Sequence, residues 1–159
     1  MTAASMPALR TTEPGPGPAA YAVEELWYML LSRRWSSLAV VSPERTPNTL
    51  RLARSLAEVG TRNRRRTVEL VDALQLDIER AAAIAQMMES DGDLPRIADS
   101  RFVIALDSPI VNPIAIEVLT ACDTVVLLLE KGVSKIPQAR KVIEIVGRQR
   151  LIGAVLALE

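Results

Sequence analysis

The chain has 159 residues, of which 49% are apolar and 24% charged, a balance typical of a globular domain with a sizeable core. Its 19 basic and 19 acidic residues cancel, so it lacks the basic excess of nucleic-acid-binding proteins, and we expect no nucleic-acid partner. The chain contains no histidine and one cysteine, Cys122, which argues against a zinc site, a histidine-activated nucleophile and a disulfide framework. This usage fits a reducing cytoplasm, and no apolar run is long enough to span a membrane.

The N-terminal segment is rich in proline and glycine, which alternate in EPGPGPAA (13–20). Such a segment has little to pack against a core, so residues 1–20 are predicted to form a disordered lead. Residues 21–159 are predicted to form a single domain. It begins with AVEELWYMLLSRR (22–34), where apolar residues recur at helical spacing and predict an amphipathic helix.

Strands and helices then alternate to the end of the chain. Predicted strands cover 37–42, 66–73, 101–109, 124–130 and 151–158, and predicted helices cover 49–60, 77–90, 112–122 and 137–149. Gly60 is predicted to end the first of these helices, as glycine often does. Several strands are continuous apolar runs, which indicates that both sheet faces are covered. The pattern predicts a three-layer α/β domain, with a parallel sheet of about five strands and helices on both faces.

Polar residues follow three of the predicted strands. The loop SPERTPNT (42–49) follows the first, Asp72 ends the second and Asp107 ends the third. Ligands of open parallel sheets bind at the carboxyl ends of the strands. This edge is therefore the predicted site of any function.

These three segments resemble motifs of the bacterial tyrosine autokinases (BY-kinases) of capsule and exopolysaccharide assembly, relatives of the MinD and ParA ATPases. The phosphate-binding loop of that family reads S-P-x-x-G-E-G-K-S-T, and SPERTPNTLRLARSLA fits it without a gap from Ser42 and Pro43. The family's second strand ends in I-D-A-D, where this chain has LVDA with Asp72. Its Walker B motif, V-I-I-D-T-P-P, is matched by VIALDSPI with Asp107.

The C-terminal third gives the best match to this family. It follows the pattern L-A-x-x-D-G-V-L-L-V-V, then G-x-T, then L-G-V-V-L-N, through Asp123, Gly132, Ser134 and Gly153. The resemblance covers residues 22–158, and it rests on the order and spacing of the motifs. It implies a P-loop NTPase-like domain with MinD/ParA-type topology.

The phosphate-binding loop departs from the family at every residue that binds nucleotide. Glycines there turn backbone N–H groups toward the phosphates, and a lysine neutralises their charge. In this chain Thr46 and Asn48 replace glycines, and Pro47 removes one N–H donor. Thr49 replaces the lysine, and Leu50 replaces the Ser or Thr that binds magnesium.

We therefore expect no catalytic residue, no metal and no cofactor. The loop is interpreted as vestigial over Pro43, Glu44, Arg45, Thr46, Pro47, Asn48, Thr49 and Leu50. Asp72 and Asp107 would be vestigial magnesium ligands, although an ordinary structural role at a strand end is favoured for both.

The resemblance then implies a catalytically inactive, kinase-like protein that acts as a regulatory or binding subunit in capsular or exopolysaccharide biosynthesis and export. One alternative is a weak ATP-dependent tyrosine autokinase or ATPase with a non-standard loop. Another is a positioning protein of the ParA/MinD type. The expected partner is the cytoplasmic part of a polysaccharide co-polymerase or an active kinase paralogue, with self-association left open. The expected location is the cytoplasm, with any contact to the inner face of the membrane made through that partner.

The N-terminal helix is the candidate interface. It stands where the family carries E-x-x-R-x-x-R; Glu25 matches, while Tyr28 and Leu31 replace the arginines. Trp27 adds a large apolar side chain, and aromatic residues are enriched in interface cores. The interface candidates are thus Glu25, Trp27, Tyr28 and Leu31. The alternative is that Trp27 and Leu31 pack on the protein's own sheet.

Overall fold

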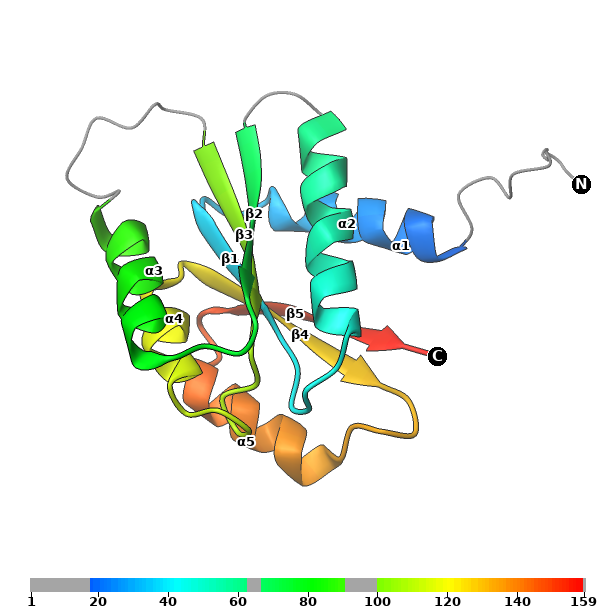
Figure 1. Ribbon diagram of the computed structural model, residues 1–159. Helices are drawn as coiled ribbons and strands as arrows, with labels where there is room; N and C mark the ends of the chain where they lie inside the picture. Colours follow the sequence, from blue (N-terminus) through cyan, green and yellow to red (C-terminus); the bar gives the residue numbers. More distant parts are fainter. Residues whose placement is uncertain (1–17, 63–66, 91–99, 159) are drawn as a thin grey trace, which may run out of the picture.

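The computed structural model describes residues 18–62, 67–90 and 100–158. The strands are β1 (Ser37–Val41), β2 (Thr67–Ala73), β3 (Ser100–Leu106), β4 (Thr124–Glu130) and β5 (Leu151–Ala157). The helices are α1 (Pro18–Leu30), α2 (Asn48–Arg62), α3 (Ile78–Ser90), α4 (Ala115–Ala121) and α5 (Ile136–Val146). The α/β class and the strand–helix alternation are as predicted (Figure 1). None of the helices in these ranges has both the length and the apolarity that crossing a membrane requires.

The start of α1 differs from the prediction. The expected disordered lead, residues 1–20, lies outside the described residues as far as residue 17. Residues 18–20, however, belong to α1, which begins at Pro18. Proline is tolerated in the first turn of a helix, where its missing N–H would have no partner, and the two alanines that follow favour the helix.

The five strands form one parallel sheet in the order β2-β3-β1-β4-β5. β1 is central and pairs with β3 on one side and β4 on the other. Helices α1 and α2 cover one face of the sheet, and α3, α4 and α5 cover the other (Figure 1). This is the three-layer arrangement of a P-loop NTPase-like fold.

Two apolar cores, one on each face, hold these layers together. Along β1, Leu38 and Val40 point into the core with α1 and α2, whereas Ala39 and Val41 point into the core with α3, α4 and α5. All five β1 residues are buried, which explains the continuous apolar run in the sequence. Cys122 belongs to the second core, where burial raises the pKa of its thiol to about 12.

Aromatic contacts attach α1 to the sheet. The rings of Trp27 and Trp35 meet edge to face, with centroids 5.7 Å apart and planes at 84°. The Trp35 indole Nε1 donates a hydrogen bond of 2.8 Å to the carbonyl of Leu30, the last residue of α1. The Arg101 guanidinium lies 4.6 Å from the centroid of the Trp35 ring, in cation–π contact. These contacts make α1 part of the folded domain.

Gly60 is not a helix end, contrary to the prediction, because α2 continues through it to Arg62. It is a point of close approach between α1, α2 and β2. A Cβ atom at this position would lie 2.6 Å from Cη2 of Trp27 and 2.8 Å from Cγ2 of Val68. Glycine is needed here for space.

We expect Gly60→Ala to lower the free energy of unfolding by about 1–2 kcal/mol, because the clash with a rigid buried ring exceeds the gain in helix propensity. Urea denaturation measures the change. Gly153→Ala is the matched control, since an added Cβ there has no neighbour within 4 Å, and it should be close to neutral. Equal stability of the two variants would contradict the proposed role of Trp27.

Candidate functional site

The candidate site lies at the carboxyl ends of β1 and β3. These strands are neighbours in the sheet, but α2 after β1 and α4 after β3 lie on opposite faces. Such a switch in direction leaves a crevice where α/β proteins bind ligands. Here the switch point is bordered by the loop after β1, residues 42–47, and by the segment after β3, residues 107–114.

An ion pair joins these two segments. Nε of Arg45 lies 3.2 Å from Oδ1 of Asp107, and Nη2 lies 2.8 Å from Oδ2, so the pair is bidentate. The Asp107 side chain is 1% exposed, whereas that of Arg45 is 53% exposed. It is the only salt bridge among residues 18–62, 67–90 and 100–158.

Asp107 has two further hydrogen-bond donors. The Asn112 side-chain amide lies 3.2 Å from Oδ2, and the Ser108 N–H lies 3.0 Å from Oδ1. Burial alone would raise the pKa of Asp107. The hydrogen bond and charge of Arg45, with the bonds from Asn112 and Ser108, outweigh burial and lower this pKa below its ordinary value. The carboxylate is therefore ionised and fully partnered at neutral pH.

The segment after β3 does not continue directly into a helix. The predicted helix 112–122 begins only at Ala115, because residues 112–114 form a tight turn whose Ala115 N–H bonds to the Asn112 carbonyl at 3.0 Å. This turn positions the Asn112 amide toward Asp107. Ser108 also donates from Oγ to the Pro43 carbonyl at 2.8 Å, a second link between the two segments.

Backbone N–H groups in the loop after β1 are engaged within the loop itself. The N–H of Glu44 bonds to Oγ of Ser42 at 3.3 Å, and that of Asn48 bonds to Oγ1 of Thr46 at 3.2 Å. The N–H of Thr49 bonds to the Thr46 carbonyl at 3.4 Å. No residue from Ser42 to Thr49, all of which the structure describes, has the positive φ found in an anion-binding nest. These N–H groups are not available to a phosphate.

The loop also carries its own negative charge. Oε1 of Glu44 accepts hydrogen bonds from Ser42 Oγ at 3.1 Å and from Ser134 Oγ at 2.6 Å. Oε1 of Glu130 accepts one from the Asn48 side chain at 2.9 Å. Two carboxylates thus border the loop, between β1 and β4. They oppose the approach of an anionic phosphate.

The remaining predicted site residues take no part in the Arg45–Asp107 pair. Thr49 is 2% exposed and Leu50 packs against the α1–α2 core, so both side chains belong to the packing of α2. Asp72 is exposed, and its Oδ1 accepts a hydrogen bond from the Leu74 N–H at 3.1 Å. In the described part of the chain, no three Asp, Glu, Cys or His side chains form a group that could hold a metal ion. The Asp107 N–H bonds to the Ala73 carbonyl at 3.2 Å, which joins the ends of β2 and β3, but no hydrogen bond between described residues links the Asp72 and Asp107 side chains.

The interface candidates on α1 separate into two groups. Glu25, Tyr28 and Leu31 are exposed, Tyr28 with 60% and Leu31 with 42% of its surface. Trp27 is 3% exposed and belongs to the core, so it cannot contribute to a surface. Met29 takes its place as an exposed apolar neighbour, at 58%.

The sequence matches no protein-family model and no curated protein. The structure is similar to a solved structure described as the BceF tyrosine kinase domain, with a TM-score of 0.67 over 87% of this chain and 77% of that chain. The two sequences are 11% identical. At this identity the similarity shows a shared fold: the protein has a BY-kinase-like, P-loop NTPase-like fold.

The Arg45–Asp107 pair was not predicted from the sequence, nor was the contribution of Asn112. A signal for the pair exists: a basic residue in the loop after one buried strand and an acidic residue at the end of another. Parallel strands bring such ends together if the strands are neighbours. The sequence pattern alone does not give the strand order, on which this step depends.

We expect Arg45→Gln to lower the free energy of unfolding at pH 7, because it leaves the buried Asp107 carboxylate without its cation. A lowered pKa stabilises the folded state above the unfolded value, near 4, and this contribution is lost as pH falls through the folded pKa. The difference between wild type and Arg45→Gln should therefore shrink as pH falls below about 4 toward the lower folded-state pKa of Asp107.

Urea titrations from pH 7 to pH 3 measure this difference. Arg51→Gln is the control, since among the described residues the Arg51 side chain donates a hydrogen bond only to Oδ1 of Asn48, at 3.2 Å. It should show little change at any pH. A difference for Arg45→Gln that stays constant over the range would show that Asp107 is not the partner that matters.

Proposed function

We propose that this protein is a catalytically inactive relative of the bacterial tyrosine autokinases, with a degenerate Walker A loop. It would act as a regulatory or binding subunit in capsular or exopolysaccharide biosynthesis and export. The fold shared with a tyrosine kinase domain supports the kinase-like part of this proposal. The order of the sequence motifs supports the connection to polysaccharide assembly.

The Arg45–Asp107 ion pair is the observation that best supports the proposed loss of catalytic activity. Asp107 aligns with the Walker B aspartate, whose role in P-loop enzymes is to help hold Mg²⁺. In this chain the Arg45 guanidinium occupies both oxygens of that carboxylate, at 3.2 and 2.8 Å. The Arg45 guanidinium thus takes the place of the positive charge that Mg²⁺ would supply. The loop also has neither glycine nor lysine to bind phosphates.

The proposed activity is then protein binding, through the exposed face of α1. This α1 face consists of Glu25, Tyr28, Met29 and Leu31. Its partner would be the cytoplasmic part of a polysaccharide co-polymerase or an active kinase paralogue, which would also bring the protein to the inner face of the membrane. The three apolar side chains are 42–60% exposed, and their burial would favour association.

We expect no binding of ATP or ADP with Mg²⁺ at sub-millimolar concentrations, because loop N–H groups and Asp107 are already engaged within the protein. Isothermal titration calorimetry of the full chain measures this directly. A saturable titration with a micromolar Kd that is lost in Asp107→Asn would overturn the proposal. It would favour the alternative of an active enzyme with a non-standard loop.

We expect the double variant Tyr28→Arg with Leu31→Arg to remain folded by circular dichroism and to lose partner pull-down or self-association. Both side chains point to solvent, so charge there disrupts a contact without affecting the core. Trp27→Ala is the contrasting variant and should destabilise the fold by about 3–5 kcal/mol. If the double variant binds normally, the interface is not on α1.

A further inference from the structure

β5 forms an open edge of the sheet. It pairs with β4 and with no other strand in the described chain. The segment LIGAVLAL (151–158) contains neither a charged residue nor a proline. Proteins usually protect such edges with charges, prolines, bulges or a covering element, because the free N–H and C=O groups can pair with another strand. β5 has only a register shift near its start, opposite Val125 and Val126.

One face of β5 also lacks a covering helix. Ala154 pairs in register with Leu127 and Leu156 with Leu129, so both point to the face of α3, α4 and α5. Both are nevertheless exposed, Leu156 by 58%. On the opposite face Val155 packs against the α1–α2 core. An apolar strip along β5 is thus left uncovered beside α5.

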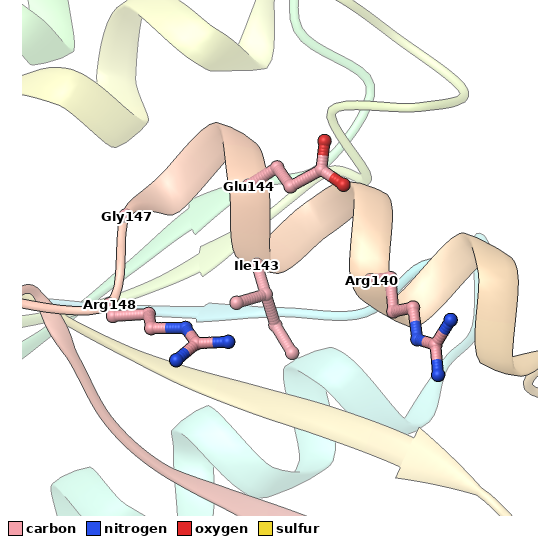
Figure 2. A pocket seen from close by; sticks show the side chains of 5 residues that line it. All are labelled: Arg140, Ile143, Glu144, Gly147 and Arg148. Carbon is pink, nitrogen blue, oxygen red and sulfur yellow. The ribbon is translucent and has the colours of Figure 1, made fainter.

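The flank of α5 next to this strip is basic. α4 packs between α3 and α5, so α5 is the outermost helix on its face. Ile143 packs against the core with α3, α4 and α5. Figure 2 shows Arg140 and Arg148 on the same side of α5 as Ile143. This side lines a pocket formed by Arg140, Ile143, Glu144, Gly147 and Arg148.

The charged groups of this pocket are arranged for an anionic ligand. Figure 2 shows the guanidinium groups of Arg140 and Arg148 on either side of Ile143, with the Glu144 carboxylate pointing away from both. Neither arginine has an acidic partner in the described parts of the chain. Residues 131–150 contain six basic residues and one acidic residue, so this region has a strong positive charge in a chain of zero net charge.

We propose that the β5 edge accepts an extended segment of a partner protein as a sixth strand, with acidic side chains that face Arg140 and Arg148. Backbone hydrogen bonds to β5 would supply affinity, and alternate side chains would supply specificity. Apolar residues of the segment would cover Leu156 and Ala154, and carboxylates would pair with the two arginines. The occupant is thus an acidic, apolar β-segment. This proposal does not depend on whether the loop after β1 binds nucleotide.

Charge also favours an acidic segment over a second copy of the chain as the occupant of the β5 edge. Antiparallel pairing of two β5 edges about a twofold axis would place α5 of both copies on the same face of the joined sheet. Arg140 and Arg148 of the two copies would then add like charges along one face, which disfavours the pairing. An acidic segment turns the same charges into attraction.

The probe for a test is a fluorescein-labelled peptide of alternating glutamate and valine, with a control peptide in which lysine replaces glutamate. Fluorescence anisotropy with the full chain should show saturable binding of the glutamate peptide below about 1 mM and none of the lysine peptide. Arg140→Glu with Arg148→Glu should weaken binding of the glutamate peptide by about tenfold or more and make the lysine peptide the preferred ligand.

Lys135→Glu with Lys141→Glu is the matched control. It changes the net charge equally, but neither lysine lines the pocket with Arg140 and Arg148, and it should leave the affinity within about twofold. Hydrogen exchange by mass spectrometry should show protection of 151–157 only when the glutamate peptide is present. Absent binding, equal effects of the two double variants, or protection of β5 by dimerisation without peptide would each overturn the proposal.

Discussion

The carboxylate of Asp107 lies at the end of a buried strand, where the ionised form is stable only if cations and donors surround it. Arg45, Asn112 and Ser108 together provide that environment. The constraint extends beyond the pair itself. Since Arg45 comes from the loop after β1 and Asn112 from the turn before α4, holding one carboxylate fixes two connections that leave the sheet on opposite faces. The Ser108–Pro43 bond strengthens the same junction.

The same constraint relates the fold to the proposed loss of catalysis. In a P-loop enzyme the strand ends keep donors and a carboxylate available for phosphates and metal, at some expense to stability. Here those groups bond to one another, and Glu44 adds a link between the loop after β1 and the segment after β4. These bonds between the strand ends favour rigidity. We therefore assign the proposed binding of other molecules to the exposed surfaces on α1 and along β5.

Much of the fold could be predicted from the sequence, because buried strands are continuous apolar runs and helices carry apolar residues at regular spacing. Features that depend on contacts between distant residues were not predictable. Gly60 looked like a helix end, yet its role is set by the ring of Trp27, which approaches it from another helix. The sequence does not decide between a surface and a core position for Trp27, since an aromatic residue on an amphipathic helix suits both.

For the candidate site, too, local features were predictable and contacts between distant residues were not. Its place at the strand ends followed from the strand–helix pattern, and the loop and Asp107 were identified by their order in the chain. The pairing of Arg45 with Asp107 joins residues 62 positions apart and requires β1 and β3 to be neighbours. Strand order arises from packing of the whole sheet, which a local pattern does not contain.

The placement of the tryptophans and the cysteine gives each layer of the domain its own spectroscopic or chemical signal. Trp27 and Trp35, the only two tryptophans, lie in the core with α1 and α2, whereas the single thiol, on Cys122, lies in the core with α3, α4 and α5. Intrinsic fluorescence therefore reports on one layer and thiol accessibility on the other. Coincidence of the two signals during denaturation would mean that the sheet couples both layers into a single cooperative unit.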